Sequence, residues 1–215
     1  MRKSKGDIRI IEAVDTHIER YIGKIAFVLD EIDSDLVHVD VYVIAATNDR
    51  PYHCFVTSGM SEKAMPVPNG ALDGRFAELM ICLPPDCPLT MEAWKDETNW
   101  WPLRLLKGLA RYPHENKTWL YAGHSIPWSD PPKPYAENTK MTSVVLLRPR
   151  LIPEEYQIIH VSKKKHIRLW GLFPLYQEEE DLKVRDGSDK LEELFDQNGV
   201  TELLSPSRPS VAPLM

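Results

Sequence analysis

The sequence predicts a single α+β domain in which a mixed, largely antiparallel sheet is flanked by helices. Helix-like and strand-like segments are interspersed along the 215 residues. Several neighbouring strands are joined by connections too short to hold a crossover helix, which favours antiparallel pairing. The chain has no internal repeat and no linker that divides it, so we expect one domain over residues 1–215.

Residues 1–30 are predicted to hold an amphipathic helix. Between residues 8 and 29, apolar side chains recur at intervals of three and four, and charged side chains occupy the opposite face. Such a stripe packs against the rest of a domain, and we expect the same here. A role at a membrane surface or in partner binding is the alternative.

The next part of the chain is predicted to supply strands. Residues 36–45 alternate valines with His, Asp and Tyr, which is typical of a half-buried strand. Residues 60–74 and 127–139 are rich in Pro, Gly or Asn, so both are predicted to be loops. Further strands are expected at residues 52–57, 76–83, 118–126 and 142–147.

A helix and a hairpin are predicted in the second half. Residues 101–112 show helical periodicity, with Pro102 in the first turn, where its missing N–H removes no hydrogen bond. Residues 156–161 and 167–172 have the pattern of a hairpin with a charged connection.

The C-terminal part is predicted to be helical and then irregular. A helical stretch is expected after Pro174, with an interruption near Gly187. Residues 189–196 complete it, and the following Asn-Gly pair is a stop signal. Residues 200–215 are rich in Pro and Ser and are expected to form an irregular tail.

The balance of charge argues against several classes of ligand. The chain has 26 Lys and Arg residues against 32 Asp and Glu residues, a formal net charge of −6. A protein of this sign has no general attraction for nucleic acid or anionic lipid, so neither is expected as a partner. A basic protein is the more natural complement.

The cysteines and the N-terminus indicate a reducing compartment. Cys54, Cys82 and Cys87 are odd in number and lack the spacing of a disulfide framework or a zinc site. The N-terminus lacks the apolar region of a signal peptide, and no stretch reaches the ~20 apolar residues that span a bilayer. We therefore expect a cytoplasmic protein with no metal and no cofactor.

No established catalytic motif occurs in the sequence. An enzymatic alternative is a hydrolase or a metal-dependent enzyme that uses His114 or His124 with nearby carboxylates. The candidate carboxylates are Glu78, Asp86 and Asp130. Their spacing matches no known set of ligands, and a glycine precedes His124 at the end of an apolar strand. We therefore favour a capping or hydrogen-bonding role for His124.

Tryptophans are candidates for a binding surface. Three of the six flank the start of the predicted helix, and Trp128 lies in the proline-rich loop. Exposed Trp side chains near loops are frequent hot spots in protein interfaces. Trp119 and Trp170 lie in predicted strands and are expected in the core.

Seven short segments stand out by their order along the chain. The combination WP-x₂-LL-x-GLARY with a downstream GH-x₃-W is the most specific part. In this order the segments resemble the suppressor of fused (Sufu) family, most clearly over residues 55–195. They are TSGMS (57–61), FAELMICL (76–83), WWPLRLLKGLARY (100–112), AGHSIPW (122–128), TSVVLLRP (142–149), GLFPLY (171–176) and KLEELFD (190–196).

The resemblance implies a non-enzymatic protein-binding module. Animal members of the family hold a transcription factor by pairing a short peptide as an added strand between two lobes. This chain resembles the N-terminal lobe alone. Stand-alone domains of this kind are typical of bacteria, where they resemble immunity proteins that neutralise toxins. We therefore expect an immunity protein or a regulator that sequesters a partner, which is either a basic toxin or a peptide added at a sheet edge. A domain without any partner is a third possibility.

The resemblance also suggests binding residues. In animal members, a tyrosine before the glycine of the TSGMS segment and an aspartate in the loop before FAELMICL contribute to peptide binding. Ser58 stands at the tyrosine position, which argues against the same ligand, and Asp73 is the nearest counterpart of the aspartate. The candidate partner-binding residues are Ser58, Gly59, Met60, Ser61, Asp73, His124 and Trp128.

Overall fold

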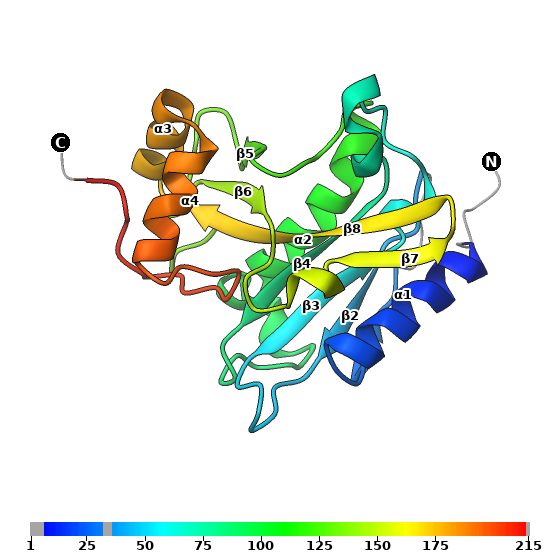
Figure 1. The fold of residues 1–215 in the computed structure, drawn as a ribbon. Helices are drawn as coiled ribbons and strands as arrows, with labels where there is room; N and C mark the ends of the chain where they lie inside the picture. Colours follow the sequence, from blue (N-terminus) through cyan, green and yellow to red (C-terminus); the bar gives the residue numbers. More distant parts are fainter. Residues whose placement is uncertain (1–6, 32–35, 214–215) are drawn as a thin grey trace.

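The computed structural model describes residues 7–31 and 36–213. Within these residues, strands form one sheet in the order β1-β2-β3-β4-β8-β6-β5, and β7 pairs with β8 beside this path. The β4–β8 pair is parallel, and the other pairs are antiparallel. The predicted α+β fold with a mixed, largely antiparallel sheet is confirmed (Figure 1).

The elements agree with most of the predicted segments. The strands are β1 (Phe27–Leu29), β2 (Asp40–Ile44), β3 (His53–Ser58), β4 (Ala77–Leu83), β5 (Ser125–Pro127), β6 (Ser143–Leu147), β7 (Ile158–Ser162) and β8 (Lys165–Leu175). The helices are α1 (Ile8–Tyr21), α2 (Glu97–Glu115), α3 (Gln177–Asp186) and α4 (Ser188–Gln197), and the short 3-10 helices are η1 (Met60–Glu62), η2 (Asn69–Gly74), η3 (Ala93–Lys95) and η4 (Glu154–Tyr156). Among the helices described here, none is both long and apolar enough to cross a membrane.

Helices cover both faces of the sheet. On one face, α2 packs Trp101 and Leu106 against apolar strand residues such as Val43 and Leu79. On the other face, α1 lies at one end of the sheet and α3 with α4 lies at the other (Figure 1). This two-sided cover explains why every residue of β4 is buried and why its sequence is a nearly continuous apolar run.

Helix α2 begins earlier than the sequence predicts. Asp96 caps its N-terminus by accepting a hydrogen bond from the Thr98 N–H at 2.9 Å. Pro102 therefore lies inside the helix rather than in its first turn. Since Pro102 has no N–H, the Thr98 carbonyl lacks its helical donor, and the Asn138 side chain donates to it at 3.0 Å instead.

Three other segments differ from their predicted structure. The helix expected up to residue 29 ends at Tyr21, and β1 occupies residues 27–29. The strand expected at residues 118–126 is reduced to β5, because the chain turns at Gly123, whose φ is 79°. Pro174 does not open a helix but lies within β8.

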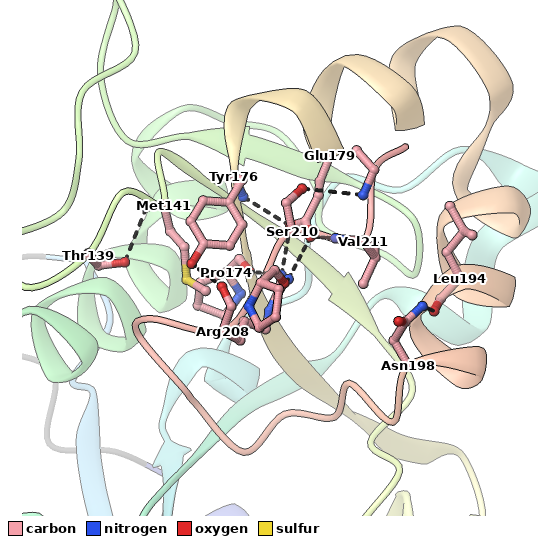
Figure 2. A network of polar contacts seen from close by, with 12 residues as sticks. Thr139, Met141, Pro174, Tyr176, Glu179, Leu194, Asn198, Arg208, Ser210 and Val211 are labelled. Atoms are coloured by element: carbon pink, nitrogen blue, oxygen red, sulfur yellow. Dashed lines mark hydrogen bonds and ion pairs between the residues drawn. The ribbon is translucent and has the colours of Figure 1, made fainter. Parts of the chain in front are cut away.

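The C-terminal segment is irregular but fixed to the body of the domain. Arg208 donates to both carboxylate oxygens of Glu179, at 2.6 and 2.7 Å, and Glu179 is fully buried (Figure 2). The same carboxylate accepts from the backbone N–H groups of Tyr176 and Val211 at 3.0 and 2.9 Å. One ion pair thus joins the start of α3 to the tail.

Candidate functional site

The TSGMS turn is buried around the carboxylate of Glu78. Glu78 Oε1 accepts hydrogen bonds from the Gly59 N–H at 2.9 Å and from the Ser61 N–H at 3.0 Å. The hydroxyls of Ser61 and Thr57 each donate to Glu78 at 2.6 Å. Burial raises the pKa of Glu78, and these hydrogen bonds oppose the rise. A fully buried side chain therefore fixes the conformation of the turn.

Gly59 is required by the close approach of another loop. Its φ is 124°, and a Cβ at this position would lie 1.7 Å from the His38 carbonyl oxygen. Ser58, Met60 and Ser61 are 3%, 1% and 0% exposed. The structure thus places these four predicted binding residues inside the domain rather than on its surface.

The side chains of Lys165 and His114 also contact this turn. Lys165 Nζ donates to the Ser61 carbonyl at 2.9 Å, and His114 Nε2 donates to the Met60 carbonyl at 2.9 Å. Burial lowers the pKa of His114. His114 therefore has a structural contact that accounts for its position.

Asp73 lies on the exposed η2 turn and contacts the first of three neighbouring ring side chains, Tyr121, Trp119 and His124. It accepts a hydrogen bond from the Tyr121 hydroxyl at 3.0 Å and forms an ion pair with Arg168 at 3.0 Å. Tyr121 packs beside Trp119, and the Trp119 ring meets the edge of His124 at 4.6 Å. The structure thus connects Asp73 with His124, two predicted residues that are far apart in the sequence.

Trp119 is not the core strand residue that the sequence predicts. It lies in the irregular segment before β5, partly exposed but packed against the core, whereas Trp170 is buried as expected. Burial lowers the pKa of His124, which packs on Trp119. These partly exposed rings form one wall beside the start of β5.

Strand β5 is an edge of the sheet. Among the described residues it pairs with β6 alone. Leu146 donates to the His124 carbonyl at 3.0 Å, and Trp128 donates to the Thr142 carbonyl at 2.8 Å. Because the bonding direction alternates along an antiparallel pair, the Ser125 N–H and carbonyl and the Pro127 carbonyl point away from β6, and Pro127 has no N–H to offer. These groups are available to an added strand.

An apolar groove of about 230 Å³ lies between β5 and α2. Trp128 is 39% exposed at its rim, and the Arg104 guanidinium lies 4.0 Å from the centre of its ring. The groove is lined by Leu105, Gly108, Leu109, Tyr112, Ile126, Pro127, Trp128, Tyr135 and Val144.

Tyr135 lines this groove and has a buried hydroxyl. The residue is 3% exposed, its ring stacks on Trp101 at 4.9 Å, and its hydroxyl has no hydrogen-bond partner among the residues that the structure describes. A buried hydroxyl without a partner is costly, by roughly 1–3 kcal/mol. A ligand would remove that cost by accepting this hydrogen bond only if the Tyr135 ring shifts and brings the hydroxyl into the groove.

Gly108 is a second feature of the groove that the sequence interpretation missed. It lies in the middle of α2, where glycine costs about 1 kcal/mol relative to alanine. It is exposed, and a Cβ added here would meet no atom within 4 Å. Packing inside the domain therefore does not require this glycine. A glycine inside a predicted helix was the signal that could have revealed it.

The candidate residues of the enzymatic alternative lie at separate places in the structure. His114 and Glu78 contact the buried turn, while Asp86 and Asp130 are exposed in loops. Within residues 7–31 and 36–213, no group of three or more His, Cys, Asp or Glu side chains is placed to hold a metal ion.

Comparisons with known proteins agree on one family. The family model described as Suppressor of fused protein (SUFU) matches residues 35–209. A solved structure named as a SUFU homolog from Neisseria gonorrhoeae FA 1090 is similar with a TM-score of 0.72 and 14% identity, covering 97% of this chain and 100% of that one. No curated protein sequence matches the chain.

Two further solved structures share the fold. The Sufu-Fu complex matches with a TM-score of 0.64 and 15% identity, covering 98% of this chain and 93% of that one. Drosophila Suppressor of Fused gives a TM-score of 0.64 and 15% identity over 94% of this chain, which spans 51% of that protein.

Proposed function

The chain belongs to the suppressor of fused family, and from this premise we propose that it is a non-catalytic module that binds a protein partner through an extended peptide. The observation that carries the proposal is the unpaired edge of β5 beside an apolar groove. A peptide strand would pair with the N–H and carbonyl of Ser125 and with the carbonyl of Pro127. Every second side chain of that peptide would then face the groove.

Two groove residues support a ligand rather than packing within the domain. Among the residues that the structure describes, the Tyr135 hydroxyl lacks a partner, and a shift of its ring on binding would let a peptide carbonyl or carboxylate accept its hydrogen bond. Gly108 leaves open space at a cost in helix stability, and that space accommodates an apolar side chain of the partner. Trp128 at the rim supplies a large contact surface of the kind found in binding hot spots.

The predicted site residues take unequal parts in this proposal. We place Trp128 and His124 in contact with the peptide and Asp73 at the far end of the same surface. Residues 58–61 contribute indirectly, because they are buried and only support the neighbouring elements.

The charge of the domain favours a basic partner. Glu180 on α3 accepts a hydrogen bond from the Ser125 hydroxyl at 2.6 Å, so α3 lies next to the edge strand. The same helix exposes the acidic side chains of Glu178 and Asp181. Together with the net charge of −6, this acidic helix would attract a basic protein. In detail, we propose a cytoplasmic immunity protein or regulator of bacterial type that sequesters such a partner.

Site-specific photo-cross-linking tests the proposal. A photoreactive side chain replaces Gly108 in the groove, and a control chain has it at Ile8, which is 62% exposed on α1 at the other face. Both chains are irradiated in native lysate, and adducts are identified by mass spectrometry. We expect one protein to be linked at position 108 and not at position 8. Equal labelling at both positions, or none at 108, would contradict the proposal.

A further inference from the structure

Cys54 and Cys82 face each other across β3 and β4. They are register partners in the antiparallel pair, and their sulfur atoms lie 3.4 Å apart. The Cys82 N–H donates to the Glu202 carbonyl at 2.9 Å, and the Cys82 carbonyl accepts from Leu204 at 2.8 Å. Both backbone groups of Cys82 therefore point away from β3, and the cysteines form a non-hydrogen-bonded pair.

The Cα atoms of a non-hydrogen-bonded pair have the separation that a disulfide requires. Residues opposite each other at a non-hydrogen-bonded position have Cα atoms about 4.5 Å apart. Disulfides span Cα distances of about 4.4–6.8 Å. A disulfide between Cys54 and Cys82 therefore requires the two sulfur atoms to move closer together, while the pairing of β3 with β4 stays as it is.

Arg50 activates one of the two sulfur atoms. Its Nη1 lies 3.1 Å from Cys54 Sγ, and carbonyl oxygens of Ala45 and Tyr52 hold the guanidinium in place. The hydrogen bond from the Cys82 thiol and the nearby Arg50 charge lower the pKa of Cys54. Burial raises the pKa of Cys82, so Cys54 is the cysteine of the pair that loses its proton more readily.

Arg50 also connects this pair to the surface. The two cysteines are 1% and 0% exposed, but Arg50 lines an open cavity of about 530 Å³ together with residues of the turn after α1. Gly23 in that turn lies beside the guanidinium. A molecule of the size of hydrogen peroxide that enters this cavity meets the cation that contacts Cys54.

We propose that Cys54 and Cys82 form a redox-sensitive dithiol, which a small hydroperoxide converts into an intramolecular disulfide. The Cys54 thiolate attacks the peroxide, the O–O bond breaks, and the departing oxygen takes up a proton as an alcohol or water. The resulting Cys54 sulfenic acid reacts with Cys82: the S–S bond forms, and the hydroxyl leaves with the Cys82 proton as water. Two thiols lose two electrons, which the peroxide accepts. A dithiol reductant reverses the modification.

Mass spectrometry of the folded chain tests this modification. Cys87→Ser removes the third cysteine, and the protein is treated with hydrogen peroxide and then alkylated after unfolding. We expect both thiols to disappear together, a mass lower by two hydrogen atoms, and a peptide pair joined through Cys54 and Cys82. Protein that keeps two alkylatable thiols, or that gains oxygen on one cysteine without joining the other, would overturn the proposal.

Variants test the role of Arg50 separately. Arg50→Gln should slow disulfide formation on the order of tenfold, since a shift of one pKa unit changes the thiolate fraction by that factor. Arg148→Gln is the matched control, because Arg148 pairs with Glu154 at the surface and should leave the rate unchanged. Circular dichroism checks that both variants are folded. An equal rate in a folded Arg50→Gln chain would rule out activation by Arg50.

Discussion

Glu78 and Ser61 are joined by two hydrogen bonds, one from the Ser61 N–H at 3.0 Å and one from its hydroxyl at 2.6 Å. Both end on the same carboxylate oxygen, which is fully buried. The turn after β3 is therefore built around an acceptor supplied by the neighbouring strand β4. This relationship explains why a segment that reads as an exposed loop lies inside the domain.

Glu78→Gln should lower the free energy of unfolding by about 1–3 kcal/mol near pH 5, because an NH₂ group replaces one of the two oxygen atoms to which four hydrogen bonds run. The loss should depend on pH. Burial raises the folded-state pKa of Glu78 above its ordinary value of 4.5. A raised folded pKa contributes stability at low pH, and this contribution is lost as pH rises from 4.5 through the folded pKa.

Urea unfolding at several pH values checks this prediction. The difference in unfolding free energy between the wild-type chain and Glu78→Gln should shrink as pH rises. Glu155→Gln on the exposed η4 turn is the control and should show no such trend. A stability difference that grows with pH would mean that the hydrogen bonds lower the pKa of Glu78 by more than burial raises it.

Arg208→Met should destabilise the domain by about 3 kcal/mol, because it leaves the Glu179 carboxylate buried without its cation. Thermal and urea unfolding measure the loss, and limited proteolysis should cut the tail sooner than in the wild-type chain. Arg185→Met removes an ion pair with Asp186 at the surface and serves as the control. Equal stability of the two variants would show that the tail is not anchored through Arg208.

Trp128→Ala should reduce partner binding while costing about 1–2 kcal/mol of stability, less than the roughly 3–5 kcal/mol typical of a core tryptophan. The reason is its position at the rim, where the ring is 39% exposed. Trp101→Ala is the matched comparison, since Trp101 is fully buried under the same groove. Urea unfolding of both variants distinguishes a tryptophan at the rim of the groove from one in the core. Similar losses would place Trp128 in the core.

Gly108→Ala should stabilise the domain by roughly 0.5–1 kcal/mol, because alanine loses less backbone entropy in a helix and its Cβ meets no atom here. Gly171→Ala is the contrasting variant: its Cβ would lie 3.0 Å from a ring carbon of Phe173, so it should destabilise. The melting temperatures of both variants check these two predictions. A loss of stability in Gly108→Ala would mean that the glycine is needed within the fold.

The sheet and most helices follow from local patterns in the sequence, whereas the exceptions depend on distant contacts. The sequence pattern does not predict the start of α2, because Pro102 lies inside the helix and the Thr98 carbonyl that it leaves without a helical donor accepts from the distant Asn138. The strand predicted at residues 118–126 is longer than β5 because a half-buried turn and a strand are both rich in apolar residues. Periodicity alone cannot separate them.

The candidate site could be predicted only in part for the same reason. Trp128 was recognised from its type and its loop, and its exposure fits a contact residue. The burial of Ser58 to Ser61 depends on Glu78, which lies in another strand. The importance of Tyr135 becomes visible only when its hydroxyl is found without a partner.

The affinity of the partner for Gly108→Arg tests the central claim most directly. The Cβ of the new side chain meets no described atom within 4 Å, its guanidinium adds bulk and charge beside the groove, and Ile8→Arg adds the same charge on the opposite face. With the protein cross-linked at position 108 as ligand, we expect Gly108→Arg to bind at least about tenfold more weakly, or ~1.4 kcal/mol, and Ile8→Arg to bind like the wild-type chain. Equal affinity of Gly108→Arg and the wild-type chain would show that the groove is not the binding site.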